Sequence, residues 1–134
     1  MSGRRILIVE DEFIVAYEIQ QTLEDRGFTV CGMVASGEAA VITAERERPD
    51  CILMDVNIRG TIGGIEAARR IGAGLGVPIA FLTGFPSGQV MEQAHDVTPI
   101  ACFNKPLNLD EICVVLEQTL GRGDVTVESD GEAS

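Results

Sequence analysis

Four side chains that are far apart in the sequence have the types needed for phosphoryl chemistry. They are the carboxylates of Asp11 and Asp55, the hydroxyl of Thr83 and the ammonium of Lys105. Two carboxylates that are brought together repel each other unless a cation or a proton lies between them. Oxygen ligands of this kind suit Mg²⁺, while a hydroxyl and an ammonium can bind phosphoryl oxygens. An aspartate in such a setting can be the nucleophile of a phosphoryl transfer.

Short apolar runs lead into these polar positions. Five runs occur, at residues 5–9, 28–35, 51–54, 77–82 and 100–103. Continuous apolar runs of this length favour strands that are buried on both faces of a parallel sheet. Four of the runs end in polar groups that a core would not choose, at residues 10–12, 55–57, 83–84 and 104–106.

The segments between the runs have the spacing of helices. Apolar residues recur on one helical face, as at Val15, Ile19 and Leu23. Asn108 followed by Glu111 is typical of a helix start and predicts a last helix. The weakest predicted helix covers residues 86–95. Pro86 suits the first helical position, but few apolar residues line one face of this helix, so we expect it to be mobile.

The alternation of strands and helices predicts an α/β fold. We expect a (βα)5 doubly wound parallel sheet of five strands in the order 2-1-3-4-5. Its polar strand ends would meet at one rim, where ligands bind in open α/β sheets. Residues 1–120 would form one domain. Residues 121–134 hold four acids and one Arg, and predict an acidic, disordered tail.

Composition and charge exclude several classes of protein. The 134 residues are 46% hydrophobic and 23% charged, which excludes a disordered or collagen-like chain. The net charge of −11 repels phosphate backbones and anionic lipids, so we expect no nucleic acid partner and no membrane partner. The absence of a long apolar run or a signal sequence favours a cytoplasmic protein.

The four cysteines show no metal-binding or disulfide pattern. They lie among apolar neighbours and lack CxxC spacing, which favours small buried side chains: Cys31, Cys51, Cys102 and Cys113.

Five motifs together resemble the receiver domain of two-component response regulators. They are the acids at 10–12, Ile-Leu-Met-Asp-Val-Asn at 52–57, Gly-Ile-Glu-Ala-Ala-Arg-Arg-Ile at 64–71, Thr83-Gly84 and Lys105-Pro106. The resemblance covers about residues 4–120. It implies that Asp55 accepts a phosphoryl group from a phosphohistidine on a histidine kinase or a histidine phosphotransfer protein.

The same resemblance implies an Mg²⁺ site. Asp11, Asp55 and the main-chain carbonyl of Asn57 would be its protein ligands, and Glu10 would bind through water. The chain would then be a signalling receiver that takes part in its own phosphorylation and dephosphorylation, rather than an enzyme.

The resemblance also assigns residues around the phosphoryl group. Thr83 and Lys105 would bind its oxygens and act in catalysis with Asp55, and the Lys105-Pro106 peptide would be cis. The implied function is that of a single-domain response regulator, which signals through altered protein–protein contacts or acts as a phosphate sink.

The stretch Phe-Leu-Thr-Gly-Phe at residues 81–85 is similar to the "FAT GUY" subgroup of receivers, with Leu82 in place of Ala. Many receivers carry Tyr or Phe three residues before the lysine, where this chain has Cys102. Our hypothesis is that Phe85, beside Thr83, reports phosphorylation in place of that aromatic by moving its loop.

Three other functions compete with this interpretation. A haloacid-dehalogenase-like aspartyl-phosphate phosphatase also has its nucleophile at a strand end, but it needs an acid where Asn57 stands. A flavodoxin-like FMN-binding protein would have the same fold, but the acids at 10–12 would repel the FMN phosphate. A receiver used only for docking would not need Asp55, Thr83 and Lys105 together.

Overall fold

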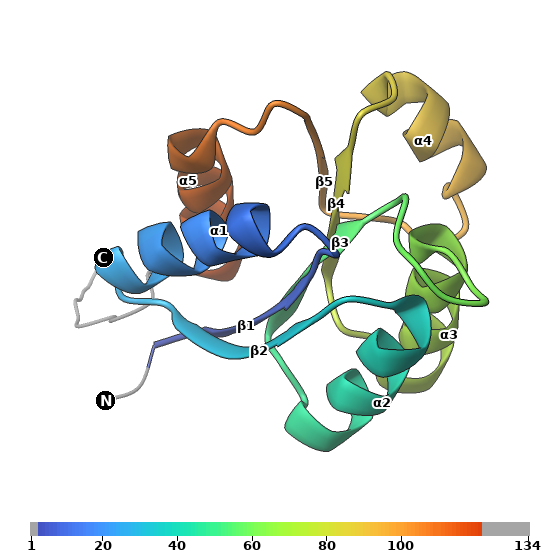
Figure 1. Ribbon diagram of the computed structural model, residues 1–134, viewed down its shortest axis with the longest axis horizontal. Coiled ribbons are helices and arrows are strands. Elements are labelled where there is room, and N and C mark those ends of the chain that lie inside the picture. Colours follow the sequence, from blue (N-terminus) through green and yellow to red (C-terminus); the bar gives the residue numbers. More distant parts are fainter. Residues whose placement is uncertain (1–2, 122–134) are drawn as a thin grey trace.

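The computed structural model describes residues 3–121, in which five strands alternate with five helices (Figure 1). The strands are β1 (Arg5–Val9), β2 (Thr29–Val34), β3 (Cys51–Asp55), β4 (Ile79–Thr83) and β5 (Ala101–Asn104). The helices are α1 (Phe13–Asp25), α2 (Gly37–Glu47), α3 (Gly64–Leu75), α4 (Ser87–Gln93) and α5 (Leu109–Leu120). Each predicted strand is present.

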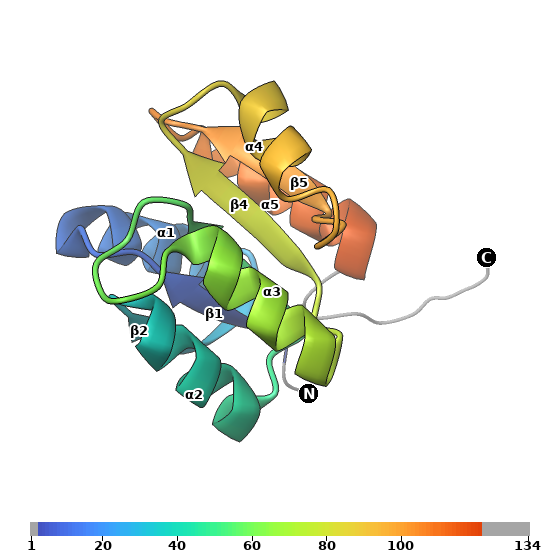
Figure 2. The same ribbon diagram turned by 90° about the vertical axis from the view of Figure 1, so that its right-hand side faces the viewer.

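The strands form one parallel sheet in the order β2-β1-β3-β4-β5, which confirms the predicted fold and strand order. Helices α1 and α5 cover one face, and α2, α3 and α4 cover the other (Figures 1 and 2). Parallel strands need crossover connections, and the helices between the strands supply them.

Each face of the sheet has its own apolar core. Side chains of Ile8, Leu53 and Leu82 join α1 and α5 on one face. The alternate residues of the same strands, such as Met54 and Phe81, pack with α2, α3 and α4 on the other face. All residues of β3 and β4 are therefore buried, as expected for strands that are covered on both sides.

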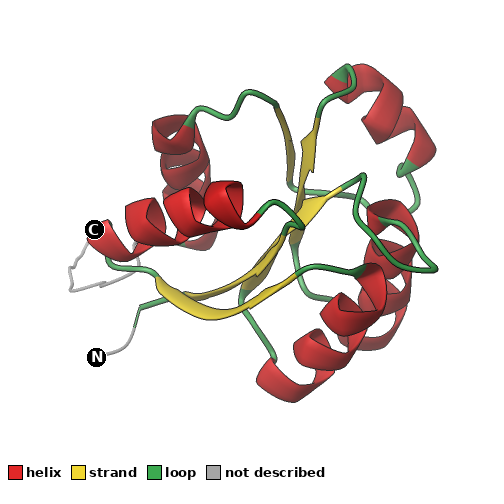
Figure 3. Ribbon diagram, in the orientation of Figure 1, coloured by secondary structure: helices red, strands yellow, loops and turns green. Residues whose placement is uncertain are grey.

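The strand register brings the polar strand ends together. Val9 pairs with Met54, so the chain leaves β1 beside the end of β3. On the other side of β3, Asp55 pairs with Leu82, and Thr83 then pairs with Asn104. The loops that follow these strands all lie at the same rim of the sheet, which we call the carboxyl rim (Figure 3).

Two helix starts can be compared with the sequence patterns. The side chain of Asn108 accepts a hydrogen bond from the N–H of Glu111 at 3.1 Å, which confirms the predicted start of α5. Pro86 precedes α4 as its N-cap instead of occupying the first helical position. Its ψ of 134° is extended, so the helix begins one residue later. The mobility of α4 stays a prediction.

All four cysteines are free thiols, but they differ in burial. Cys51 and Cys113 are buried as predicted, and burial raises the pKa of the Cys51 thiol to about 12. Cys31 and Cys102 are only half-buried, because they lie on β2 and β5, the two edge strands. The prediction of four buried thiols was therefore wrong for these two.

The predicted tail lies outside the described residues except for Gly121, so the division of the chain at residue 120 stays a prediction. Within residues 3–121, no helix has the length and apolar character needed to cross a bilayer.

Candidate functional site

Asp55 lies at the centre of the carboxyl rim, as the last residue of β3. Its side chain is 4% exposed, and each of its oxygens accepts one hydrogen bond. The N–H of Asn57 donates to Oδ1 at 3.0 Å, and the ammonium of Lys105 donates to Oδ2 at 3.0 Å. These two donors fix the orientation of the carboxylate at the end of the central strand.

The start of α3 packs directly against this position. A Cβ atom built on Gly64 would lie 2.1 Å from the main-chain oxygen of Asp55. Only glycine permits so close an approach, and the N–H of Gly64 also donates to the carbonyl of Val56 at 3.1 Å. The segment after Asp55 is thereby held in a tight turn, with the side chain of Asn57 exposed at the rim.

Glu10 is a buried carboxylate beside Asp55. Its Oε2 accepts a hydrogen bond from the N–H of Glu12 at 3.1 Å. Its Oε1 accepts none, although the ammonium of Lys105 lies 3.2 Å away as an ion pair. Burial, assisted by the charge of Asp55, raises the pKa of Glu10 to about 7 despite the Glu12 hydrogen bond and Lys105.

Asp11 completes a cluster of three acids. Glu10, Asp11 and Asp55 each offer one oxygen, and these oxygens all lie within 4.8 Å of one another. The donor set consists of oxygens alone, and one buried oxygen of Glu10 lacks a hydrogen bond. Both features fit a hard divalent cation such as Mg²⁺, which binds oxygen and relieves repulsion between carboxylates.

Lys105 is a cation that the fold brings to this cluster. Besides Asp55 and Glu10, its Nζ lies 3.9 Å from Glu12. Burial disfavours the charged ammonium, but the hydrogen bond and charge of Asp55, followed by those of Glu10, outweigh it and raise the pKa of Lys105. The lysine therefore stays protonated at neutral pH. The peptide bond between Lys105 and Pro106 is cis.

Thr83 ends β4 next to Asp55 and is buried. Its Oγ1 accepts a hydrogen bond from the N–H of Phe85 at 2.9 Å, which leaves the hydroxyl proton available to another acceptor. The carbonyl of Phe85 in turn accepts from the side-chain amide of Asn104 at 2.6 Å. Asn104 was predicted only as part of a strand end, and this contact, which ties the β4–α4 loop to β5, was not predicted.

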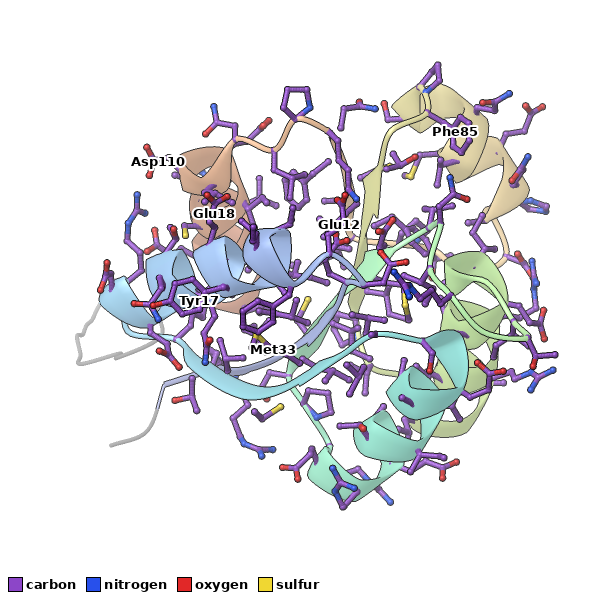
Figure 4. All side chains as sticks on the ribbon, in the orientation of Figure 1. Glu12, Tyr17, Glu18, Met33, Phe85 and Asp110 are labelled. Atoms are coloured by element: carbon purple, nitrogen blue, oxygen red, sulfur yellow. The ribbon has the colours of Figure 1, made fainter. Side chains whose placement is uncertain are left out.

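Phe85 and Cys102 differ in their surroundings. The phenyl ring of Phe85 is 46% exposed, and it lines a cavity of about 230 Å³ with Asn57, Gln89 and Gln93. Figure 4 shows Phe85 at the start of α4, on the outside of the molecule. Cys102, on β5, is half-buried and offers no aromatic ring.

An exposed apolar surface borders the cluster on α1. Phe13 and Ile14 are each 72% exposed, and the ring of Phe13 stacks on that of Tyr17 with centroids 6.2 Å apart. Figure 4 shows Tyr17 on the side of α1 that faces β2, together with Met33, and Glu18 on the side that faces α5.

On the α5 side of α1, a cavity of about 330 Å³ lies next to the site. Its lining is apolar at Val15, Leu107 and Leu109, whereas Glu12 and Glu18 make it acidic. Lys105 also lines this cavity, so its ammonium is next to a recess that opens to solvent.

Most of the chain matches a known protein family. The family model described as the response regulator receiver domain matches residues 6–117. The chain belongs to this family. Its strand order, its acidic cluster and the lysine after β5 are thus those of a receiver domain, as the motifs indicated.

Curated relatives of this receiver are signalling regulators. The transcriptional regulatory protein PdtaR of Mycobacterium tuberculosis is 30% identical over 131 residues, which are 98% of this chain and 63% of PdtaR. The chain thus spans less than two thirds of that relative. Sporulation initiation phosphotransferase F of Bacillus subtilis is 26% identical over 113 residues, which are 84% of this chain and 90% of that protein.

Solved structures of receiver domains have the same fold. The signal receiver domain of a modulated diguanylate cyclase from Desulfovibrio desulfuricans superposes with a TM-score of 0.80 and 33% identity, over 87% of this chain and 93% of that chain. The receiver domain of the sensor histidine kinase PA1611 from Pseudomonas aeruginosa has a TM-score of 0.77 and 33% identity, over 90% of this chain and 99% of that chain. That structure holds a magnesium ion coordinated in its active site cleft.

Proposed function

We propose that Asp55 is the phosphoryl acceptor of this receiver domain. The observation that carries the proposal is the setting of its carboxylate, which is buried at a strand end and held by the ammonium of Lys105 at 3.0 Å. Glu10 and Asp11 lie within the same cluster, and Thr83 is on β4, the strand that pairs with β3. This combination brings a nucleophile, a fixed cation and a hydroxyl donor to one rim.

In the proposed transfer, an Asp55 oxygen attacks the phosphorus of a phosphohistidine. The new O–P bond forms as the N–P bond breaks, and the electron pair of that bond stays on the leaving imidazole nitrogen, which takes up a proton. Lys105 and the Thr83 hydroxyl donate to the phosphoryl oxygens as negative charge gathers there. Hydrolysis reverses the role of Asp55, because water attacks phosphorus and the carboxylate leaves.

Mg²⁺ is the cofactor that this site supports best. We infer that Asp11, Asp55 and the main-chain carbonyl of Asn57 bind it directly and that Glu10 binds through water. The bound ion would neutralise charge on the phosphoryl oxygens. The chain's own part is to hold three carboxylates within reach of one cation, which costs stability until the cation arrives.

The phosphodonor is proposed to be a histidine kinase or a histidine phosphotransfer protein that docks on α1 and the neighbouring loops. The exposed rings of Phe13 and Tyr17 stand beside the acidic cluster, and exposed apolar side chains that gather in one place are typical of an interaction site. The net charge of −11 and the acids Glu12 and Glu18 favour a partner with basic residues around an apolar patch.

We further propose that the output is a change in protein contacts, or the removal of phosphate from a kinase, as for a single-domain response regulator located in the cytoplasm. The relative that supports this role is the sporulation phosphotransferase, which is matched over 90% of its length. Phe85 is the proposed reporter of phosphorylation. When Thr83 turns towards the phosphoryl group, its oxygen can release the Phe85 N–H and free the loop into α4.

Intact-mass measurement tests the acceptor. Treatment with a small phosphodonor and Mg²⁺ should add one phosphoryl group to the wild type and none to Asp55→Ala. Asp110→Ala is the matched control, since Asp110 is exposed at the start of α5 and pairs with Arg26, away from the site (Figure 4). Equal labelling of the wild type and Asp55→Ala would disprove the assignment. Sustained release of phosphate from a simple phosphate ester would instead favour the phosphatase.

The role of Phe85 needs a separate measurement. Phe85→Ala should still be phosphorylated, but the phosphorylation-dependent NMR shifts of α4 and the partner affinity should both change. Met91→Ala, which removes an exposed apolar side chain from α4 itself, is the control. Identical shifts and affinity in Phe85→Ala and the wild type would exclude Phe85 as the reporter.

A further inference from the structure

The loop between β3 and α3 is fastened to the start of α2. We call residues 58–62 of this loop the strap. Arg59 pairs with Ser36 in an isolated parallel bridge, and the N–H of Thr61 donates to Oε2 of Glu38 at 2.6 Å. Figure 3 shows this loop in green beside the first turn of α2.

Gly60 makes the contact between the strap and Glu38 possible. Its φ of +109° is in the region that favours glycine, and a Cβ atom there would lie 2.2 Å from Oε1 of Glu38. Hydrogen bonding by Thr61 lowers the pKa of Glu38, so this carboxylate stays ionised as the anchor of the strap. The strap is therefore held at a defined place beside the carboxyl rim.

From this position Arg59 reaches the acidic cluster. Its Nε lies 3.4 Å from Oδ2 of Asp11, one of the three clustered acids. The Arg59 side chain is 78% exposed, whereas that of Asp11 is 19% exposed. Lys105 pairs with Glu10 and Asp55. The two cations thus contact different members of the cluster.

We propose that Arg59 is a positioning residue that competes with the divalent cation for Asp11, and that Glu38 holds it there through the strap. The inference rests on the proposed function, because it assigns Asp11 to the metal site. Mg²⁺ requires near-ideal octahedral geometry around its oxygen ligands. A guanidinium beside Asp11 both orients that carboxylate and repels an arriving cation.

The exposure of Arg59 limits the strength of this competition. An ion pair at 3.4 Å with an exposed partner is a weak one, and it can exchange for a metal ion without disturbing the core. Arg59 therefore lowers the affinity for Mg²⁺ without closing the site. A receiver built in this way binds Mg²⁺ less tightly than its three acids alone would allow.

Calorimetric titration of the metal-free, unphosphorylated protein with Mg²⁺ tests this competition. Arg59→Gln should bind Mg²⁺ about two- to fivefold more tightly than the wild type, which is the range of a surface ion pair. Arg46→Gln removes the same charge from the far end of α2, where Arg46 pairs with Glu47, and controls for long-range charge. Unchanged affinity in Arg59→Gln, or an equal gain in Arg46→Gln, would overturn the proposal.

Glu38→Ala separates the strap from simple charge effects. Loss of a negative charge should weaken the binding of a cation, whereas release of the strap should strengthen it. We expect tighter binding, in the same direction as Arg59→Gln, and weaker binding would refute the anchoring role of Glu38.

If Asp11→Asn and the wild type bind Mg²⁺ equally, the metal site of the proposed function has failed. A large loss in Asp11→Asn with no change in Arg59→Gln means that this inference alone has failed.

Discussion

The two ends of the same sheet are built in opposite ways. At the amino end, the N–H of Arg5 donates to Asp50 at 2.7 Å, and the Arg5 guanidinium pairs with Glu47 at 2.7 Å. Charges of opposite sign meet there near the surface. At the carboxyl rim, three acids of like charge cluster, and the two nearest the core, Glu10 and Asp55, share one lysine. The difference teaches that paired charges favour the fold at the amino end, while the rim concentrates like charges that disfavour it until a cation, as proposed above for Mg²⁺, is bound.

The core between the two ends must offset the repulsion at the rim. Phe81→Ala tests this, because Phe81 is fully buried between the sheet and its helices. We expect the free energy of unfolding to fall by about 3–5 kcal/mol in chemical denaturation. Val114→Ala, on the exposed face of α5, should change it by less than about 0.5 kcal/mol. Similar losses in both variants would mean that the core does not have this role.

Removal of charge at the rim should raise the free energy of unfolding instead of lowering it. Glu10→Gln should stabilise the metal-free protein at pH 8 by roughly 1–3 kcal/mol, since the buried carboxylate is held there in its unfavourable ionised form. The same variant should lose most of the stabilisation that Mg²⁺ gives to the wild type. Thermal denaturation with chelator and with Mg²⁺ measures both effects. If Glu10→Gln is less stable than the wild type in chelator, the ion pair with Lys105 fully offsets the cost of burying the Glu10 carboxylate.

The pH dependence of the free energy of unfolding should report the protonation of Glu10. The folded pKa of Glu10, about 7, is above the ordinary value of 4.5, so protonation of Glu10 favours the folded state. Its contribution is fully present below pH 4.5 and is lost as the pH rises through about 7. Denaturation of the wild type in chelator should show this decline, and Glu10→Gln should lack it. If the free energy of unfolding falls equally with pH in both proteins, the decline belongs to other groups.

The smallest effect is expected at the amino end. Arg5→Gln should lower the free energy of unfolding by about 0.2–1 kcal/mol, because the ion pair with Glu47 is partly exposed. The loss should shrink in high salt and should be the same with and without Mg²⁺. Dependence on Mg²⁺ would show that the two ends of the sheet are coupled.

Features that depend on residues adjacent in the sequence could be predicted from the sequence alone. The runs that become β1 and β3 are apolar apart from Arg5 and lead into acids, so both the strands and the polar rim could be predicted. Asn108 was recognisable as a helix cap for the same reason. The parallel order of the strands then placed Asp55 and Lys105 at one rim, where their side chains do meet.

Contacts that depend on loop conformation could not be predicted in this way. The pairing of Arg59 with Asp11 requires the strap to lie against α2, which Gly60 and Glu38 bring about together. The predicted strand order placed the second and fifth strands at the edges of the sheet, but the burial of the cysteines was predicted only from their apolar neighbours in the sequence. The half-burial of Cys31 and Cys102 was therefore not foreseen.

The hydrogen bond from Asn104 to the carbonyl of Phe85 has a mechanical consequence. Asn104 immediately precedes Lys105, and Phe85 is held to Thr83, so a short chain of bonds joins the two side chains that we propose to bind the phosphoryl group to the segment before α4. The β4–α4 loop and the end of β5 are thus held together. We therefore expect a displacement of Lys105 to reach α4 through Asn104 and Phe85, although no aromatic ring stands at position 102.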